Sequence, residues 1–118
     1  MPDLTREDVI RILAVTSQAR LSGVNLSGLH LQGLNFSGSD LTHANLAGTD
    51  LTGAYMRGAR MEEANLEKAI LVNANLKEAN LKGANIKHAD LTGANLIDTN
   101  LYGVSLDGAK MDKIKGLP

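Results

Sequence analysis

The sequence predicts an all-β solenoid, in which the chain winds into stacked coils, with a short α-helix at its N-terminal end. A large apolar residue stands at every fifth position from Leu21 to Met111, and no polar residue interrupts the series. Small residues, turn-forming residues and glycines recur at fixed places around it. The segment 1–18 lacks this period and shows helical spacing instead. A chain of 118 residues has room for one such domain.

Residues 1–18 are expected to form a capping segment that contains a helix over about residues 5–15. Thr5 is a good N-cap residue, and the acidic Asp8 suits the positive end of a helix. One helix face then carries the apolar residues Val9, Ile12 and Leu13. We expect this face to lie over the first coil.

Residues 19–113 hold 19 repeats of five residues, whose positions we number −2 to +2 around the central one. The centre is Leu in 14 repeats, Met in three, and Ile and Phe in one each. Position −2 is Ala in 12 repeats, and position −1 is Asn or Asp in 12. Position +2 is Gly in 11. These preferences indicate that each position of the repeat has the same structural role in every repeat.

The five-residue period is incompatible with a long helix or a flat strand. Five residues turn an α-helix by about 500°, so successive centres would scatter around its axis. In a strand, side chains alternate with a period of two, so successive centres would alternate between the two faces. All centres can point inward only if the chain turns a corner once per repeat. Asn, Asp and Gly supply the turn conformations and local hydrogen bonds that such corners need.

Several repeats match one sequence motif closely, at residues 44–48, 64–66, 74–76, 84–86 and 94–96. With these segments, the chain resembles the pentapeptide-repeat proteins, and in particular the short members found in cyanobacteria. The resemblance implies a right-handed, four-sided β-helix with four repeats per turn. The 19 repeats would then make about 4.75 coils.

Charge spacing favours four repeats per turn without deciding it. A four-repeat offset pairs Glu62 with Lys82 and stacks Asp40 between two arginines, although it also stacks Arg57 on Lys77. A three-repeat offset pairs Glu62 with Lys77 instead. Exposed pairs of this kind contribute only about 0.2–1 kcal/mol each, so both offsets stay open on these grounds.

The C-terminal end is thinly covered in sequence terms. The tail, residues 114–118, is too short to form a lid like the N-terminal helix. Ile97 and Tyr102 occupy outward positions that other repeats fill mainly with polar residues. We therefore expect a homodimer through this end, or else a tail that folds across the open coil and covers it alone.

Composition and motifs argue against several function classes. No cysteine is present, and none of the three histidines (His30, His43, His88) stacks on another at the four-repeat offset, so we expect no metal or cofactor. The chain has no nucleophile elbow and no phosphate-binding loop, so we expect no enzyme. No apolar run is long enough for a membrane span, and the N-terminus is unlike a signal peptide. We expect a cytoplasmic protein that binds neither membranes nor nucleic acid.

The remaining classes are a protein-interaction module and a DNA mimic. An irregular repeat places Tyr55, Arg57 and Arg60 together, and such residues are preferred interface anchors. Alternatively, Tyr55 simply packs flat along its side beside Asn35 and Asn75, which we favour.

Some pentapeptide-repeat proteins protect DNA gyrase by resembling DNA. A rod of roughly 23 Å would need on the order of 13 net negative charges for that. The net charge of −1 makes mimicry the weaker alternative to an unidentified protein partner.

Overall fold

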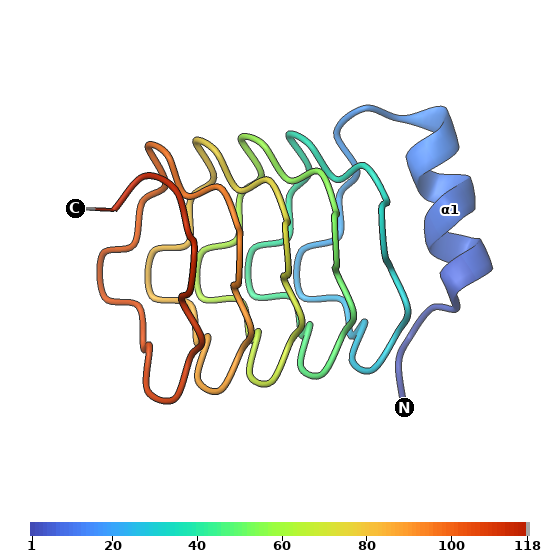
Figure 1. The fold of residues 1–118 in the computed structure, drawn as a ribbon. Helices are drawn as coiled ribbons and strands as arrows, with labels where there is room; N and C mark the ends of the chain where they lie inside the picture. The colour runs from blue at the N-terminus through green and yellow to red at the C-terminus, as the bar shows by residue number, and fades with distance from the viewer. Residues whose placement is uncertain (118) are drawn as a thin grey trace.

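The computed structural model describes residues 1–117 as a rod of stacked coils, with one helix lying across its N-terminal end (Figure 1). The helix α1 spans Arg6–Val15, and the coils follow one another along the rod in sequence order. The rod and helix together measure 37 × 26 × 21 Å. The solenoid and the short N-terminal helix that the sequence predicts are confirmed.

Helix α1 begins at a capping box. The Thr5 hydroxyl accepts a hydrogen bond from the Asp8 amide, and the Asp8 carboxylate accepts one from the Thr5 amide. Within the helix, the side chain of Val9 is fully buried. The first coil meets the helix with larger −2 residues than the alanines of the middle coils, and they are half-buried: Val24, Leu29 and Leu34. The segment before the helix also pairs with the first coil, because Asp3 both donates to and accepts from the backbone of Asn25.

Successive coils are joined by residues that stand four repeats apart in the chain. Sixteen isolated parallel bridges run from Arg20 with Asp40 to Asn95 with Lys115. The coil therefore has four sides, and of the two offsets that charge spacing left open, the four-repeat one is observed. Each bridge occupies a single −1 position because the chain turns before a second residue can pair. No longer strand therefore forms anywhere in residues 1–117.

Every corner is the same kind of tight turn. In the repeats centred on Leu21 through Leu106, the carbonyl of the centre accepts a hydrogen bond from the amide three residues later. The +2 residue has a positive φ in all 19 repeats, as a turn of type II requires at its third position. Glycine fills 11 of these positions. The other eight hold side chains at φ 58–63°, a strained conformation for such residues: His43, Glu63, Lys68, Asn73, Glu78, His88, Asp98 and Lys113.

This geometry pairs all five backbone amides of a regular repeat, as residues 64–68 illustrate. One amide closes the turn, one donates to the previous coil, and two donate to the next coil. The fifth, at +1, has no backbone acceptor and donates to the side chain at −1, here from Glu67 to Asn65 Oδ1 at 3.0 Å. All 12 Asn and Asp residues at position −1 accept such a bond. The repeated Asn is therefore a structural residue.

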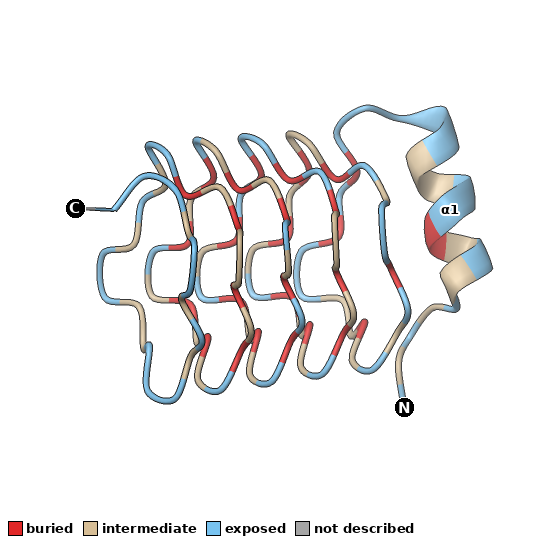
Figure 2. Ribbon diagram, viewed as in Figure 1, coloured by how far each residue is buried: buried red, intermediate tan, exposed pale blue. Residues whose placement is uncertain are grey.

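The apolar core is a continuous column of central residues. Every centre from Leu21 to Leu96 is at most 2% exposed, and the −2 residues from Ala44 to Ala94 pack beside them (Figure 2). Position −2 stays small because it lies directly against the neighbouring coils. A larger side chain there would overpack the stack at a cost of about 1–3 kcal/mol.

The column opens at the C-terminal end. Leu101 and Met111 are only half-buried, and Leu106 is 40% exposed. The described part of the tail continues along the side of the coil that carries Asn75 and Asn95, where Lys115 pairs with Asn95. It does not cross the open end. Pro118, the last residue of the expected tail, lies outside the described residues.

A charged centre should destroy the fold. Replacement of the fully buried Leu66 by Asp places a carboxylate without a partner inside the apolar column. We expect Leu66→Asp to abolish the cooperative thermal transition in far-ultraviolet circular dichroism. Lys77→Asp, which makes an outward +1 residue acidic, should melt within a few degrees of the parent. Equal melting temperatures for the two variants would contradict the inward assignment.

Candidate interaction surfaces

The described residues assemble no metal or cofactor cluster. No group of three or more His, Asp or Glu side chains among residues 1–117 could hold a metal ion. His30 lies on the side of the rod where it bridges to Asp50, whereas His43 and His88 lie at two different corners. Within the same residues, no helix is both long and apolar enough to cross a membrane.

Tyr55 interrupts a column of −1 residues that carries Asn at positions 35, 75 and 95. The parallel bridges place it between Asn35 and Asn75, as the packing alternative expects, and its side chain is 55% exposed. Unlike its two neighbours, Tyr55 has no side-chain acceptor that can fold back onto the +1 amide. The Arg57 amide therefore lacks the bond that Asn35 and Asn75 provide for their own repeats. Tyrosine at this position costs the turn a hydrogen bond.

Arg57 and Arg60 are both held by carboxylates of neighbouring coils. Arg57 Nε lies 2.7 Å from Glu78 Oε1, and Arg60 Nη2 lies 3.0 Å from Asp40 Oδ2. The hydrogen bond and charge of Arg57 lower the pKa of the Glu78 carboxyl. Both arginines stay more than half exposed, so they present oriented guanidinium groups on either side of one corner.

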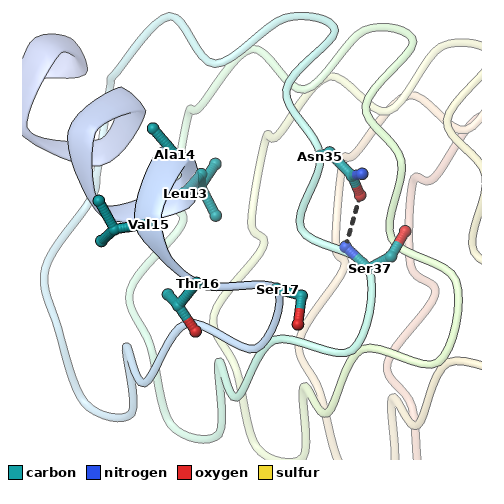
Figure 3. A pocket seen from close by; sticks show the side chains of 7 residues that line it. All are labelled: Leu13, Ala14, Val15, Thr16, Ser17, Asn35 and Ser37. Atoms are coloured by element: carbon teal, nitrogen blue, oxygen red, sulfur yellow. Dashed lines mark hydrogen bonds between the residues drawn. The ribbon is translucent and has the colours of Figure 1, made fainter.

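Two shallow hollows lie near the N-terminal half of the rod. One, of about 410 Å³, surrounds the corner next to Arg60, and its lining residues are Gln18, Arg20, Gly38, Asp40, Gly58 and Arg60. The other, of about 480 Å³, lies between the end of α1 and the first coil (Figure 3). There the Asn35 side chain accepts the Ser37 amide, and Val15 is 85% exposed. Both hollows lie beside the irregular repeat or its column.

Ile97 and Tyr102 lie near the open C-terminal end, away from Tyr55. Ile97 is 37% exposed and Tyr102 is 76% exposed. The ammonium group of Lys82, one coil below, lies 5.9 Å from the centroid of the Tyr102 ring, within the range of a cation–π contact. The five predicted site residues therefore form two separate groups, one in the middle of the rod and one at its end.

The four-repeat offset placed Asp40 between Arg20 and Arg60, and the pair with Arg60 is confirmed. The same offset stacked Arg57 on Lys77, whereas the guanidinium reaches Glu78, the residue that follows Lys77, so this partner carried no signal in the sequence. Nothing in the sequence singled out Leu106, whose exposure follows from its place in the last described coil.

The family profile for pentapeptide repeats matches residues 19–58, 59–96 and 79–114. Among curated proteins, no significant match to the sequence was found. Among solved structures, a pentapeptide-repeat protein of the Arabidopsis thaliana thylakoid lumen is 32% identical, with a TM-score of 0.66 over 81% of this chain and 63% of its own length.

Two further structures share the fold. HetL of Nostoc sp. strain PCC 7120, a protein involved in heterocyst differentiation regulation, is 29% identical, with a TM-score of 0.55 over 81% of this chain and 54% of its own length. QnrB1, a plasmid-mediated fluoroquinolone resistance protein, is 19% identical, with a TM-score of 0.50 over 78% of this chain and 57% of its own length. The chain thus spans less than two thirds of these proteins, and the neighbours confirm a right-handed β-helix.

Restoring asparagine at position 55 should stabilise the rod. In Tyr55→Asn, the new side chain can accept the Arg57 amide as Asn35 and Asn75 do for their repeats, which adds about 0.5–1 kcal/mol. Urea unfolding would show this as a higher midpoint at unchanged slope. Asn75→Ala, which removes the same bond one coil away, should lower the midpoint. A less stable Tyr55→Asn variant would show that Tyr55 serves the fold.

Acid should remove part of the stability of the last coils. Hydrogen bonds from the Thr92 hydroxyl and amide, with the nearby charge of Lys110, hold the pKa of Asp90 below its ordinary value. Because the folded pKa is the lower one, this stabilisation is present above about pH 4 and is lost as pH falls through the folded value. Asp90→Asn keeps the oxygen acceptor but not the charge.

We therefore expect Asp90→Asn to be less stable than the parent at pH 6, and we expect this difference to shrink as the pH falls below about 4. Urea midpoints measured across this range would test the difference. A deficit that persists unchanged in acid would show that the carboxylate charge makes no contribution.

Proposed function

The chain belongs to the pentapeptide-repeat family, and on that premise we propose that it is a non-enzymatic interaction module that binds another protein through the side of its rod. The surface concerned is the Tyr55 patch, which we define as Tyr55, Arg57 and Arg60. The coil stack holds these side chains on a rigid backbone, so little conformational freedom is lost when a partner binds.

The observation that carries this proposal is the cost of Tyr55 to its own turn. At position −1, Asn pairs the +1 amide, and Tyr does not. Tyr55 nevertheless stands, half exposed, in the middle of an Asn column. A residue that weakens its turn and is exposed on the surface is more readily explained by binding than by folding.

The neighbouring residues Arg57 and Arg60 are also suited to binding a protein. Arginine and tyrosine are enriched among the residues that contribute most to protein interfaces. Arg57 and Arg60 are already oriented by Glu78 and Asp40, which supports recognition of a surface with carboxylate or carbonyl groups. The 410 Å³ hollow beside Arg60 offers room for a partner side chain.

DNA mimicry is the weaker alternative. The likeness to QnrB1 is at 19% identity and supports only the fold. A mimic needs a high density of negative charge, and the chain has a net charge of −1. Two of its carboxylates, Asp40 and Glu78, are also neutralised by arginines in the middle of the rod. A cytoplasmic location stays a prediction from the sequence.

Affinity capture with matched variants would test the proposal. The parent protein and a Tyr55→Ala/Arg57→Glu variant would be immobilised and exposed to lysate of the source cells. Tyr102→Ala/Lys82→Glu removes the other tyrosine and reverses the charge of its neighbouring cation, and it serves as the control. We expect a protein captured by parent and control but lost from the Tyr55 variant. Equal capture by all three would contradict the assignment to the Tyr55 patch.

A DNA gyrase supercoiling assay separates the two candidate functions. We expect no inhibition with a micromolar excess of this protein, because its surface lacks the charge density of DNA. Inhibition that weakens as salt rises would favour mimicry over the proposed interaction module.

A further inference from the structure

Seven repeats leave one backbone donor open. Of the 19 repeats, 12 hold Asn or Asp at −1, and in each of these the side chain accepts the +1 amide, as Figure 3 shows for Asn35 and Ser37. In the other seven, the +1 amide has no hydrogen-bond partner within residues 1–117. The Arg57 amide, beside Tyr55, is one of them, and both residues are exposed. This donor is open to an acceptor atom of a ligand.

The open Arg57 amide lies where the arginines of the repeats gather. Arg20, Arg57 and Arg60 are the three arginines of residues 19–113. Arg20 and Arg60 stand on either side of Asp40 in one column of bridges, and Arg57 lies across the corner at Gly58 from that column. The lysines of the same residues are instead spread over all four sides of the rod. The side chain best suited to pairing with a carboxylate is therefore concentrated at one corner.

The acids at this corner leave part of each guanidinium free. Glu78 accepts from Arg57 Nε, whereas the two Nη atoms of Arg57 have no hydrogen-bond partner within residues 1–117. These two atoms form an edge that binds a carboxylate through two parallel hydrogen bonds. Asp40 accepts from Arg60 Nη2 with one oxygen and from the Thr42 amide with the other. Both carboxylates are thus already paired, and the free donors point to an anionic ligand.

A hollow and a local positive charge lie at the same corner. The 410 Å³ hollow is lined by Arg20 and Arg60, and a Cβ at Gly58 would meet no atom within 4 Å, so the backbone there is open to a second chain. Over the coils up to Glu78, four cations and two acids surround this corner: Arg20, Arg57, Arg60, Lys77, Asp40 and Glu78. The corner is therefore positive in a chain whose net charge is −1.

We propose that the partner of the Tyr55 patch is a protein that binds through an acidic segment laid across this corner. The inference rests on the proposed function and extends its contact to Arg20 and the hollow. One carboxylate of the segment pairs with the two Nη atoms of Arg57, and a second lies in the hollow between Arg20 and Arg60. An oxygen of the segment accepts the Arg57 amide, in the place that Asn Oδ1 occupies in a regular repeat. The partner thus completes the irregular repeat.

A nucleic acid fits this corner less well than an acidic protein segment. A nucleic-acid strand carries a phosphate charge on every nucleotide, and its affinity depends on neutralising several of them. Asp40 and Glu78 remain at the surface here and would repel such a continuous chain of charges. An acidic segment carries its charges on separate side chains, which can reach the arginines and avoid the two acids.

Selection of random peptides of about 12 residues, displayed on phage, on the immobilised full-length protein would test the chemistry of the partner. We expect the recovered peptides to be enriched in Asp and Glu over the unselected library. Recovery without this enrichment, or no recovery, would overturn the acidic segment. A Tyr55-dependent partner captured from lysate would in that case still support the interaction module, so the two proposals fail separately.

Two substitutions of Tyr55 test the open amide. Tyr55→Ala and Tyr55→Asn both remove the ring, but only Asn supplies an acceptor that closes the Arg57 amide. By fluorescence anisotropy, we expect Tyr55→Asn to bind a fluorescein-labelled selected peptide about three- to tenfold more weakly than Tyr55→Ala. The Asn variant is expected to be the more stable protein, so unfolding would not explain this order. Equal affinities, or tighter binding by Tyr55→Asn, would overturn the role of the amide.

Arg57→Lys keeps the charge but removes the paired donors, so we expect it to bind the same peptide about tenfold more weakly than the parent. Arg11→Lys makes the same substitution at an exposed residue of α1 and should bind like the parent. Unchanged binding by Arg57→Lys would overturn the pairing with Arg57. A fluorescein-labelled oligouridylate should not bind where the peptide saturates, and an equal affinity for it would overturn the protein partner in favour of a nucleic acid.

Discussion

Backbone hydrogen bonding between successive coils is the interaction on which the rest of the structure depends. Each coil donates two amides per repeat to the next coil and one to the previous coil, and a turn bond uses a fourth. These bonds hold the centres in one column and leave a single amide per repeat, at +1, for a side chain. The preference for Asn or Asp at −1 follows from that remaining amide, because an unpaired donor is costly wherever water is excluded.

The same bonding forces every corner into one strained turn. Glycine relieves the strain at most corners, but eight corners hold larger residues. Some of these side chains lie over the glycine of the next coil: Glu63 over Gly83, Asn73 over Gly93 and His88 over Gly108. Glycine in those columns therefore supplies space as well as a conformation. The turn columns are packed along the rod, although each turn closes within its own repeat.

The candidate binding surfaces are the places where the chain departs from the regular repeat. A regular repeat pairs its amides, buries its centre and presents polar side chains, so it leaves little for a partner to recognise. Tyr55 gives up the bond to the +1 amide and presents an aromatic ring, while the last coil exposes Leu106. The first feature lies on a side of the rod and the second at its end.

The sequence by itself determined the elements that depend on local geometry. The five-residue period predicts inward centres and a corner in every repeat, and the −1 Asn residues predict a side-chain bond to the turn, because these features depend on residues close together in the chain. The helix over Arg6–Val15 was similarly readable from Thr5, Asp8 and the apolar spacing.

Only the tertiary structure decided how the coils stack and what their stacking exposes. The choice between three and four repeats per coil depends on how far the chain rotates at each corner, and small differences in that angle add up around a coil. The partner of Arg57 and the exposure of Leu106 depend in turn on which coil lies above or below. Local sequence does not contain that information, because it arises from contacts between residues that belong to different coils.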